Sequence, residues 1–158
     1  MKDVYVLGMA RTPVGSFGGS LSSLSAVELG AHSIRHAVSR ASVKPEDIEE
    51  VYMGQVLQAG AGQAPARQAA LAAGLLESTP CTTINKVCSS GMKSVMMASQ
   101  SIRVGDRNLM IAGGMESMSQ SPFYSHDARW GAKYGNRSLV DGIVRDGLQD
   151  PYDGSMMG

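Results

Sequence analysis

The sequence predicts an α/β fold in which helices cover both faces of a β-sheet. Short apolar runs alternate with longer segments of helical periodicity, in the order β-α-β-α-β-α-β, and this alternation is typical of α/β sheets. The chain has 158 residues, 43% of them hydrophobic, which is enough for one domain with a core of its own. No apolar run approaches the length of a membrane span, so we expect no membrane partner.

The first part of this pattern contains two predicted strands and one long predicted helix. Residues 4–9 are a short apolar run that predicts a buried strand. A helix is expected at residues 26–41, because Ser25 is a suitable N-cap and Glu28 stands at the capping-box position. Residues 50–57 predict the second strand.

The second part of the pattern repeats the alternation of strands and helices. Pro65 suits the first position of a helix, which we expect to run through Ala73. Residues 82–87 are rich in β-branched side chains and predict a strand. A helix is expected at residues 89–104 and a fourth strand at residues 109–112. After Ser117 the periodicity is weak, which indicates either an excursion from the sheet or the start of a second module.

Charge and cysteine content exclude several classes of partner. Lys+Arg and Asp+Glu each number 14, so there is no basic field for nucleic acid. The only cysteines, Cys81 and Cys88, are poorly placed to bridge, which favours a reducing compartment. The N-terminus shows neither a signal peptide nor an Arg- and Ser-rich leader. We therefore expect a cytoplasmic protein, or a mitochondrial matrix protein if the sequence lacks a transit peptide.

Cys88 is the candidate catalytic residue, because it lies where a predicted strand meets a predicted helix. The unpaired N–H groups and the dipole at a helix N-terminus stabilise an anion, and such sites lower a thiol pKa and make a nucleophile. The alternative is a small buried hydrophobic residue, which is how we interpret Cys81. Met92, Val95 and Met96 give the following helix an apolar face, so we expect a central buried helix with Cys88 at the floor of a cleft.

Two further patterns favour ordinary structural interpretations. His32 stands four residues after Glu28, and His36 four residues after His32, but both lie opposite the apolar stripe of their helix, so a solvated polar face is favoured over a metal site. Gly113-Gly114 lacks the Walker and G-x-G-x-x-G patterns and predicts close backbone packing.

Glu116, shortly after the glycine pair, is open to two interpretations. It is either a buried acid or a solvated one, and the sequence alone does not decide between them.

Residues 85–93, Asn-Lys-Val-Cys-Ser-Ser-Gly-Met-Lys, resemble the nucleophile segment of the thiolases, acetyl-CoA acetyltransferases in particular. Four other stretches resemble thiolase segments in the same order, so the likeness covers the whole chain. They are residues 10–17, 51–58, 62–69 and 112–119.

The resemblance implies a thiolase-like N-terminal half, a mixed β-sheet with helices on both faces that is incomplete at its last strand. Residues 1–118 would be part of the thiolase N-terminal domain, and residues 119–158 the start of the CoA-binding loop domain. It also implies a homo-oligomer, a dimer that pairs the strand at residues 82–87 across a two-fold axis.

The resemblance further implies that Cys88 is acylated. Two acetyl-CoA molecules condense to acetoacetyl-CoA, or the thiolytic reverse runs, through an acyl-cysteine intermediate. Coenzyme A thioesters are then substrates, no cofactor is bound covalently, and any potassium site of the family corresponds to positions after Gly158. Met157 aligns with a methionine that borders the acyl pocket, although Met156 stands where the family has histidine.

The chain also departs from the family pattern. The family's histidine lies in a Gly-His-Pro segment and its second cysteine in a Cys-x-Gly-Gly-Gly segment, and neither segment occurs in these 158 residues. We therefore expect this chain alone to be inactive. The alternatives are a non-catalytic paralogue that dimerises with full-length thiolase subunits, or a target of thiol modification at Cys88.

Overall fold

The computed structural model describes residues 2–131 and 133–157. Three helices and three strands alternate through most of the chain, and shorter elements follow. The helices are α1 (Ala26–Ala41), α2 (Pro65–Ala72) and α3 (Ser90–Val104), and the strands are β1 (Glu50–Gly54), β2 (Cys81–Ile84), β3 (Met110–Gly114), β4 (Phe123–Tyr124) and β5 (Val140–Asp141). The short helical turns are η1 (Pro45–Asp47), η2 (Met118–Gln120), η3 (Ala128–Trp130) and the π-type turn η4 (Val144–Leu148).

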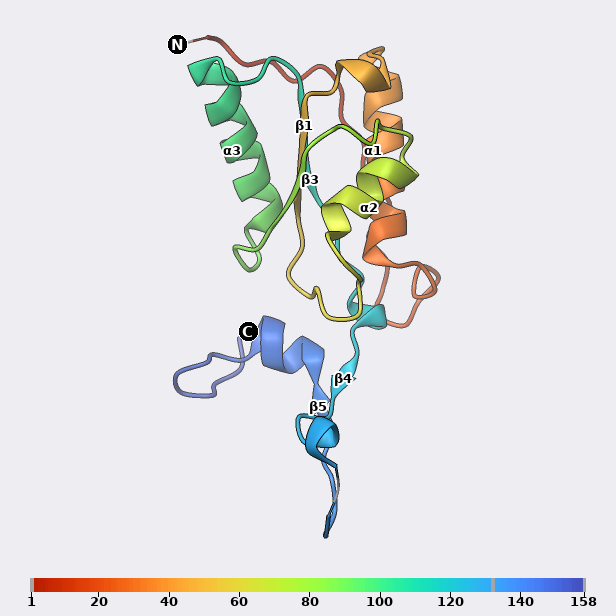
Figure 1. Cartoon of the computed structure of the whole chain (residues 1–158), viewed down its shortest axis with the longest axis vertical. Coiled ribbons are helices and arrows are strands. Elements are labelled where there is room, and N and C mark those ends of the chain that lie inside the picture. Colours follow the sequence, from red (N-terminus) through yellow and green to blue (C-terminus); the bar gives the residue numbers. More distant parts are fainter. Residues whose placement is uncertain (1, 132, 158) are drawn as a thin grey trace.

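β1, β2 and β3 form one sheet in the order β2-β1-β3, and both pairings are parallel. The helix α3 covers one face, and α1 and α2 cover the other (Figure 1). Val51 and Met53 of the central strand are buried and join Ile34, Ala66 and Ala69 in the core. Central parallel strands are buried on both faces in this way, and the α/β class predicted from the sequence is confirmed.

Residues 4–9 form no strand, so this expectation is wrong. The segment runs along α1, where a Cβ on Gly8 would lie 2.7 Å from Ala37 O, and a groove of about 610 Å³ separates it from β3. Strands exchange ladder hydrogen bonds only at a spacing of about 4.7–4.9 Å, and a backbone that stands off across a groove cannot do so. The segment is instead held at its ends, where Lys2 N donates to Arg103 O (3.2 Å) and Arg40 Nη1 to Met9 O (2.8 Å). Within the described residues, the outer edge of β3 has no partner strand.

The helix predictions agree closely with the structure. The Ser25 hydroxyl accepts from Glu28 N and the Glu28 carboxylate accepts from Ser25 N, which is the expected capping box. The strand predictions are right at their starts to within one residue, but β1 ends at Gly54 and β2 at Ile84, each three residues early. β1 ends there because Glu116 accepts hydrogen bonds from the backbone N–H groups that follow it, and β2 because Asn85 and Ser90 do the same.

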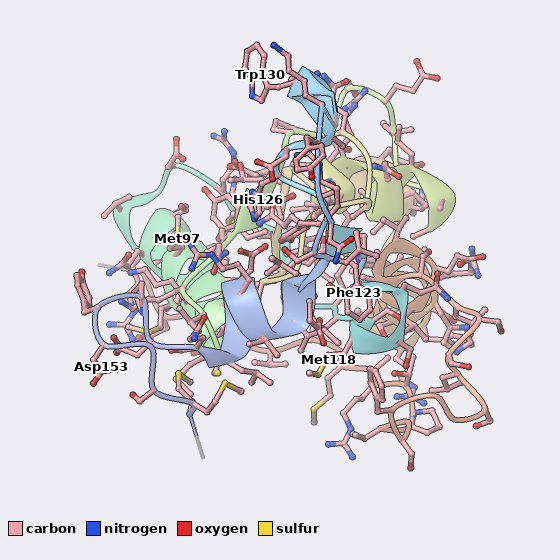
Figure 2. The ribbon with its side chains drawn as sticks, turned by 90° about the horizontal axis from the view of Figure 1, so that it is seen from below. Met97, Met118, Phe123, His126, Trp130 and Asp153 are labelled. Atoms are coloured by element: carbon pink, nitrogen blue, oxygen red, sulfur yellow. The ribbon has the colours of Figure 1, made fainter. Side chains whose placement is uncertain are left out.

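Residues 119–157 leave the sheet as an extended arm (Figure 1). Its two short strands pair antiparallel, with Phe123 opposite Asp141 and Tyr124 opposite Val140. Trp130 is 82% exposed and its ring points out into solvent in Figure 2. The arm accounts for the loss of periodicity after Ser117, while the division into two domains stays a prediction. None of the helices in the described part of the chain is long and apolar enough to cross a membrane.

Candidate active site at the carboxyl edge of the sheet

The carboxyl ends of the three parallel strands meet at one edge of the sheet. Gly54 pairs with Ile84 on one side and with Gly114 on the other, so all three strands end at the same level. Ligands of open α/β sheets bind outside this edge. The residues that leave it are therefore the first place to look for a functional site.

Cys88 lies beyond the end of β2, two residues before α3 begins, and its side chain is exposed. It is not at the floor of a cleft, which corrects the expectation from the sequence. The reason is the orientation of α3: small residues at a spacing of four, Ser90, Ser94 and Ala98, are buried against the sheet. The apolar face of α3 points away from the sheet, and Met92 on this face is 69% exposed.

Side chains at both ends of the Cys88 loop bind its backbone. Asn85 Oδ1 accepts from Val87 N (2.9 Å). Ser90 Oγ accepts from Lys86 N (2.8 Å) and donates to Val87 O (2.6 Å). These bonds replace strand pairing after Ile84, and they close a turn in which Val87 has a φ of 48°. A positive φ is unfavourable for a β-branched residue, so the turn depends on the bonds around it.

Glycines allow α3 to begin directly on the strand ends. A Cβ on Gly54 would lie 2.4 Å from the Ser90 carbonyl carbon, and one on Gly114 would lie 3.2 Å from Gly91 Cα. Only a residue without a side chain fits such a close approach. The interpretation of Gly113-Gly114 as a close-packing pair is therefore confirmed at Gly114, and the loop that carries Cys88 is seated against the sheet.

Glu116 is a half-buried acid that joins the exits of β1 and β3. Its Oε2 accepts from Val56 N (2.8 Å) and its Oε1 from Leu57 N (3.2 Å). Burial raises the pKa of this carboxyl, while the two backbone hydrogen bonds lower it. These bonds turn the chain away from the sheet after Gly54. Of the two interpretations that the sequence left open, Glu116 is therefore closer to the buried acid, and its role here is structural.

Gln55 is the residue of this edge with an unsatisfied polar atom. It is 2% exposed, and its Nε2 donates to Leu57 O (3.0 Å). Its Oε1 is buried and has no hydrogen-bond partner. Nothing in the sequence distinguishes this glutamine from its neighbours.

The remaining candidates lie away from Cys88 or face solvent. Met157 lies in the arm after η4, is 52% exposed, and donates its N–H to Leu148 O (2.8 Å), so its place at an acyl pocket stays a prediction. Cys81 is half-buried and packs against the core, as expected. His32 and His36 are exposed, as expected for a polar face. Within residues 2–131 and 133–157, no three His, Cys, Asp or Glu side chains are grouped to hold a metal ion.

Sequence reasoning missed the roles of Asn85 and Ser90. Asn and Ser often bond to nearby backbone at turns and helix ends, so their presence next to Cys88 was a signal. It was ambiguous, because the same residues bind in several ways and two serines adjoin the helix start. The observed arrangement depends on where the helix is seated on the sheet.

Comparison with known proteins gives one consistent family. The model of the "Thiolase, N-terminal domain" family matches residues 4–158. Acetyl-CoA acetyltransferase of Schizosaccharomyces pombe is 54% identical over 156 residues, which are 99% of this chain and 40% of that protein. Acetyl-CoA acetyltransferase 1 of Arabidopsis thaliana is 57% identical over 157 residues, which are 99% of this chain and 38% of that protein.

A solved structure agrees with these sequence relatives. It is the crystal structure of Acat5 thiolase from Ascaris suum in complex with coenzyme A, which superposes with a TM-score of 0.94 at 46% identity. The match covers 98% of this chain and 40% of that one. The chain thus spans about 40% of the length of the relatives it matches.

Proposed function

The chain belongs to the thiolase family, and from this membership we propose that it is the nucleophile-bearing part of an acetyl-CoA C-acetyltransferase, with Cys88 as the residue that is acylated. The observation that carries the proposal is the placement of Cys88. Its thiol is exposed at the carboxyl edge of a parallel sheet, in a turn held by side chains on both sides. A thioester can reach such a thiol, while the turn fixes where the thiol points.

The proposed reaction has two half-reactions. The Cys88 thiolate attacks the carbonyl of one acetyl-CoA, the C–S bond to coenzyme A breaks, and acetyl-Cys88 forms. A second acetyl-CoA loses a proton from its methyl carbon, and that carbon attacks acetyl-Cys88. The products are acetoacetyl-CoA, coenzyme A, which left as a thiolate in the first half-reaction and takes up the methyl proton, and the free Cys88 thiolate; thiolysis is the reverse. The positive end of the α3 dipole adjoins the loop and favours the negative charge that develops at the attacked carbonyl.

We also propose that full turnover needs polypeptide beyond these 158 residues. Cys88 is the last cysteine, and neither Gly-His nor His-Pro occurs in the sequence, so a histidine base and a second cysteine of the family pattern have no counterpart here. Two uncovered surfaces support the same proposal. Among the described residues, the apolar face of α3 has no covering element and the outer edge of β3 has no partner strand.

A homodimer through β2 is part of the proposal. β2 is the outermost strand on its side of the sheet. An edge strand presents unpaired N–H and C=O groups, which can pair with the same strand of a second copy across a two-fold axis.

A second candidate is a non-catalytic subunit that associates with full-length thiolase subunits. The exposed methionines on α3 favour it, because adaptable apolar side chains are common at protein interfaces. Co-expression with a full-length homologue distinguishes the candidates: this one predicts a complex of fixed stoichiometry in which Cys88→Ala does not alter activity.

The proposed function is tested by acyl transfer to the purified chain. We expect acetyl-CoA to transfer one acetyl group to the peptide that contains Cys88, slowly and without turnover. The acetyl group should be absent from Cys88→Ala and present in Cys81→Ala, which controls for the other thiol. Acetylation that persists in Cys88→Ala would reject Cys88 as the acyl acceptor. Steady thiolysis of acetoacetyl-CoA by the chain alone would reject the requirement for further polypeptide.

A further inference from the structure

We propose that Ser90 is a positioning residue that holds the Cys88 loop in its strained conformation. The inference rests on the proposed function, since it assumes that the placement of the Cys88 thiol matters for acyl transfer. It concerns a residue that does not touch the thiol's substrate and acts only through the loop.

The Ser90 hydroxyl uses both its donor and its acceptor on the two residues that precede Cys88. It is in the first residue of α3, and Ser90 is 4% exposed. Its oxygen accepts from Lys86 N at 2.8 Å and its proton goes to Val87 O at 2.6 Å. A serine at a helix start ordinarily caps amides inside the helix. Here the hydroxyl points backwards and links the Lys86 N–H to the Val87 carbonyl.

Val87 is the residue whose conformation needs this support. Its φ is 48°, in the left-handed region, where a β-branched side chain is least tolerated. Asn85 Oδ1 holds the Val87 N–H at 2.9 Å, and Ser90 holds the Val87 carbonyl through its hydroxyl at 2.6 Å and its backbone N–H at 3.1 Å. With Val87 fixed at both ends, the next residue, Cys88, leaves the turn in one direction.

The support of Ser90 itself is rigid. The carbonyl carbon of Ser90 lies so close to β1 that a Cβ on Gly54 would come within 2.4 Å of it. The hydroxyl therefore connects the sheet, through the seated start of α3, to the loop. Loss of this oxygen removes the partner of Lys86 N and leaves Val87 O with the Ser90 backbone N–H, so Val87 should be held less firmly in the left-handed region and Cys88 should move more freely, while the helix remains seated.

The test uses the full 158-residue chain and two variants, one of Ser90 and one of Val87. Ser90→Ala removes the hydroxyl. Val87→Gly removes the cost of the positive φ, because glycine adopts it readily. Ser94→Ala is the matched control: it removes another buried serine hydroxyl one turn later in α3, which donates to Ser90 O at 3.0 Å.

The first readout is amide hydrogen exchange of Lys86, which reports the loop without any substrate. We expect Ser90→Ala to speed exchange at Lys86 roughly tenfold or more, as for a protecting hydrogen bond that is lost, and Ser94→Ala to leave it unchanged. Unchanged exchange in Ser90→Ala would overturn the inference. So would an equal rise at core amides such as Val51, because that would mean general destabilisation.

The second readout is the acetylation rate of Cys88 by acetyl-CoA, divided by its labelling rate with iodoacetamide, a small reagent that needs little orientation. We expect this ratio to fall roughly tenfold in Ser90→Ala, since a displacement of about 1 Å is enough for such a loss. In the Val87→Gly background, Ser90→Ala should lower it by less than about threefold. Equal losses in both backgrounds would overturn the role of Val87 strain. A parent chain that is not acetylated at all would reject the proposed function, and hydrogen exchange would still decide whether Ser90 holds the loop.

Discussion

The two ends of the parallel sheet carry different kinds of residue. At the amino end, Glu50 begins β1, is largely buried, and forms an ion pair with Arg107 (Nε to Oε2, 3.1 Å). Cys81 begins β2 there, half-buried, with its Sγ donating to Thr79 O (3.3 Å). At the carboxyl end, Cys88 is exposed and the acid Glu116 is held by backbone N–H groups instead of a cation.

The difference teaches that position on the sheet, and not residue type, separates a packing cysteine from a candidate nucleophile. Cys81 and Cys88 flank the same strand. Burial raises the pKa of the Cys81 thiol, and Arg67 and Glu50 act on it in opposite directions with smaller effect. A thiol that is held neutral is a poor nucleophile. The amino end is thus suited to stability, and the carboxyl end leaves a thiol within reach of a substrate.

The largest expected effect is the labelling contrast between the two cysteines. With iodoacetamide at neutral pH, Cys88 should be alkylated roughly 100-fold faster than Cys81, because only the thiolate reacts and only an accessible one is reached. Peptide mass spectrometry measures both rates in one sample. In denaturant the two rates should converge to within about threefold, since the contrast belongs to the fold. Similar rates in the native chain would remove the distinction between the two ends.

A second prediction tests whether Cys88 depends on the seating of α3. Gly54→Ala should lower the free energy of unfolding by about 1–3 kcal/mol, because the added methyl meets backbone that cannot move aside. It should also slow acetylation of Cys88, as α3 shifts from the strand ends. Urea unfolding and acetyl transfer measure the two effects.

Arg107→Met is the matched control at the amino end of the sheet. It breaks the ion pair with Glu50 and should cost about 1–2 kcal/mol. Cys88 acetylation should stay within about twofold of the parent, because the carboxyl edge is intact. An equal loss of acetylation in both variants would show that it follows overall stability and not the seating of the helix.

The smallest expected effect is a pH dependence of stability that belongs to Cys81. Its pKa is raised above the ordinary value of 9.0, so the folded chain keeps this proton to a higher pH than the unfolded chain. The contribution to stability is therefore complete below pH 9.0 and is lost as pH rises through the folded pKa. Urea titrations from pH 8 to 10 should show a steeper fall for the parent than for Cys81→Ala. Equal slopes would indicate that burial does not favour the neutral thiol of Cys81.

Several features of this fold could be predicted because they depend on neighbours in sequence. The capping box of Ser25 and Glu28, the start of α2 at Pro65, and the extent of α3 each rest on contacts within a few residues. The placement of Cys88 at a strand-to-helix junction was predictable for the same reason. Helical periodicity and caps act over one or two turns, so the sequence shows them directly.

The failures share a different cause. The run at residues 4–9 has the composition of a strand, but strand formation needs a partner at ladder distance, and β3 is not at that distance. The methionines on α3 have helical spacing, but the face that packs on the sheet is the one whose small residues allow close approach, Ser90 and Ser94 among them. The spacing of residues shows that a helix has two different faces, but it does not show which face packs against the sheet.

The sequence by itself determined the order of helices and strands from α1 to β3, the capping box of α1, and the residue most suited to be a nucleophile, because these follow from local geometry and residue chemistry. Only the tertiary structure decided that Cys88 is exposed, that Val87 takes a left-handed turn, and that Ser90 holds it. The reason is that these features require the start of α3 to be seated on Gly54, a residue 36 positions away along the chain. Such contacts arise from packing between elements, which no window of the sequence contains.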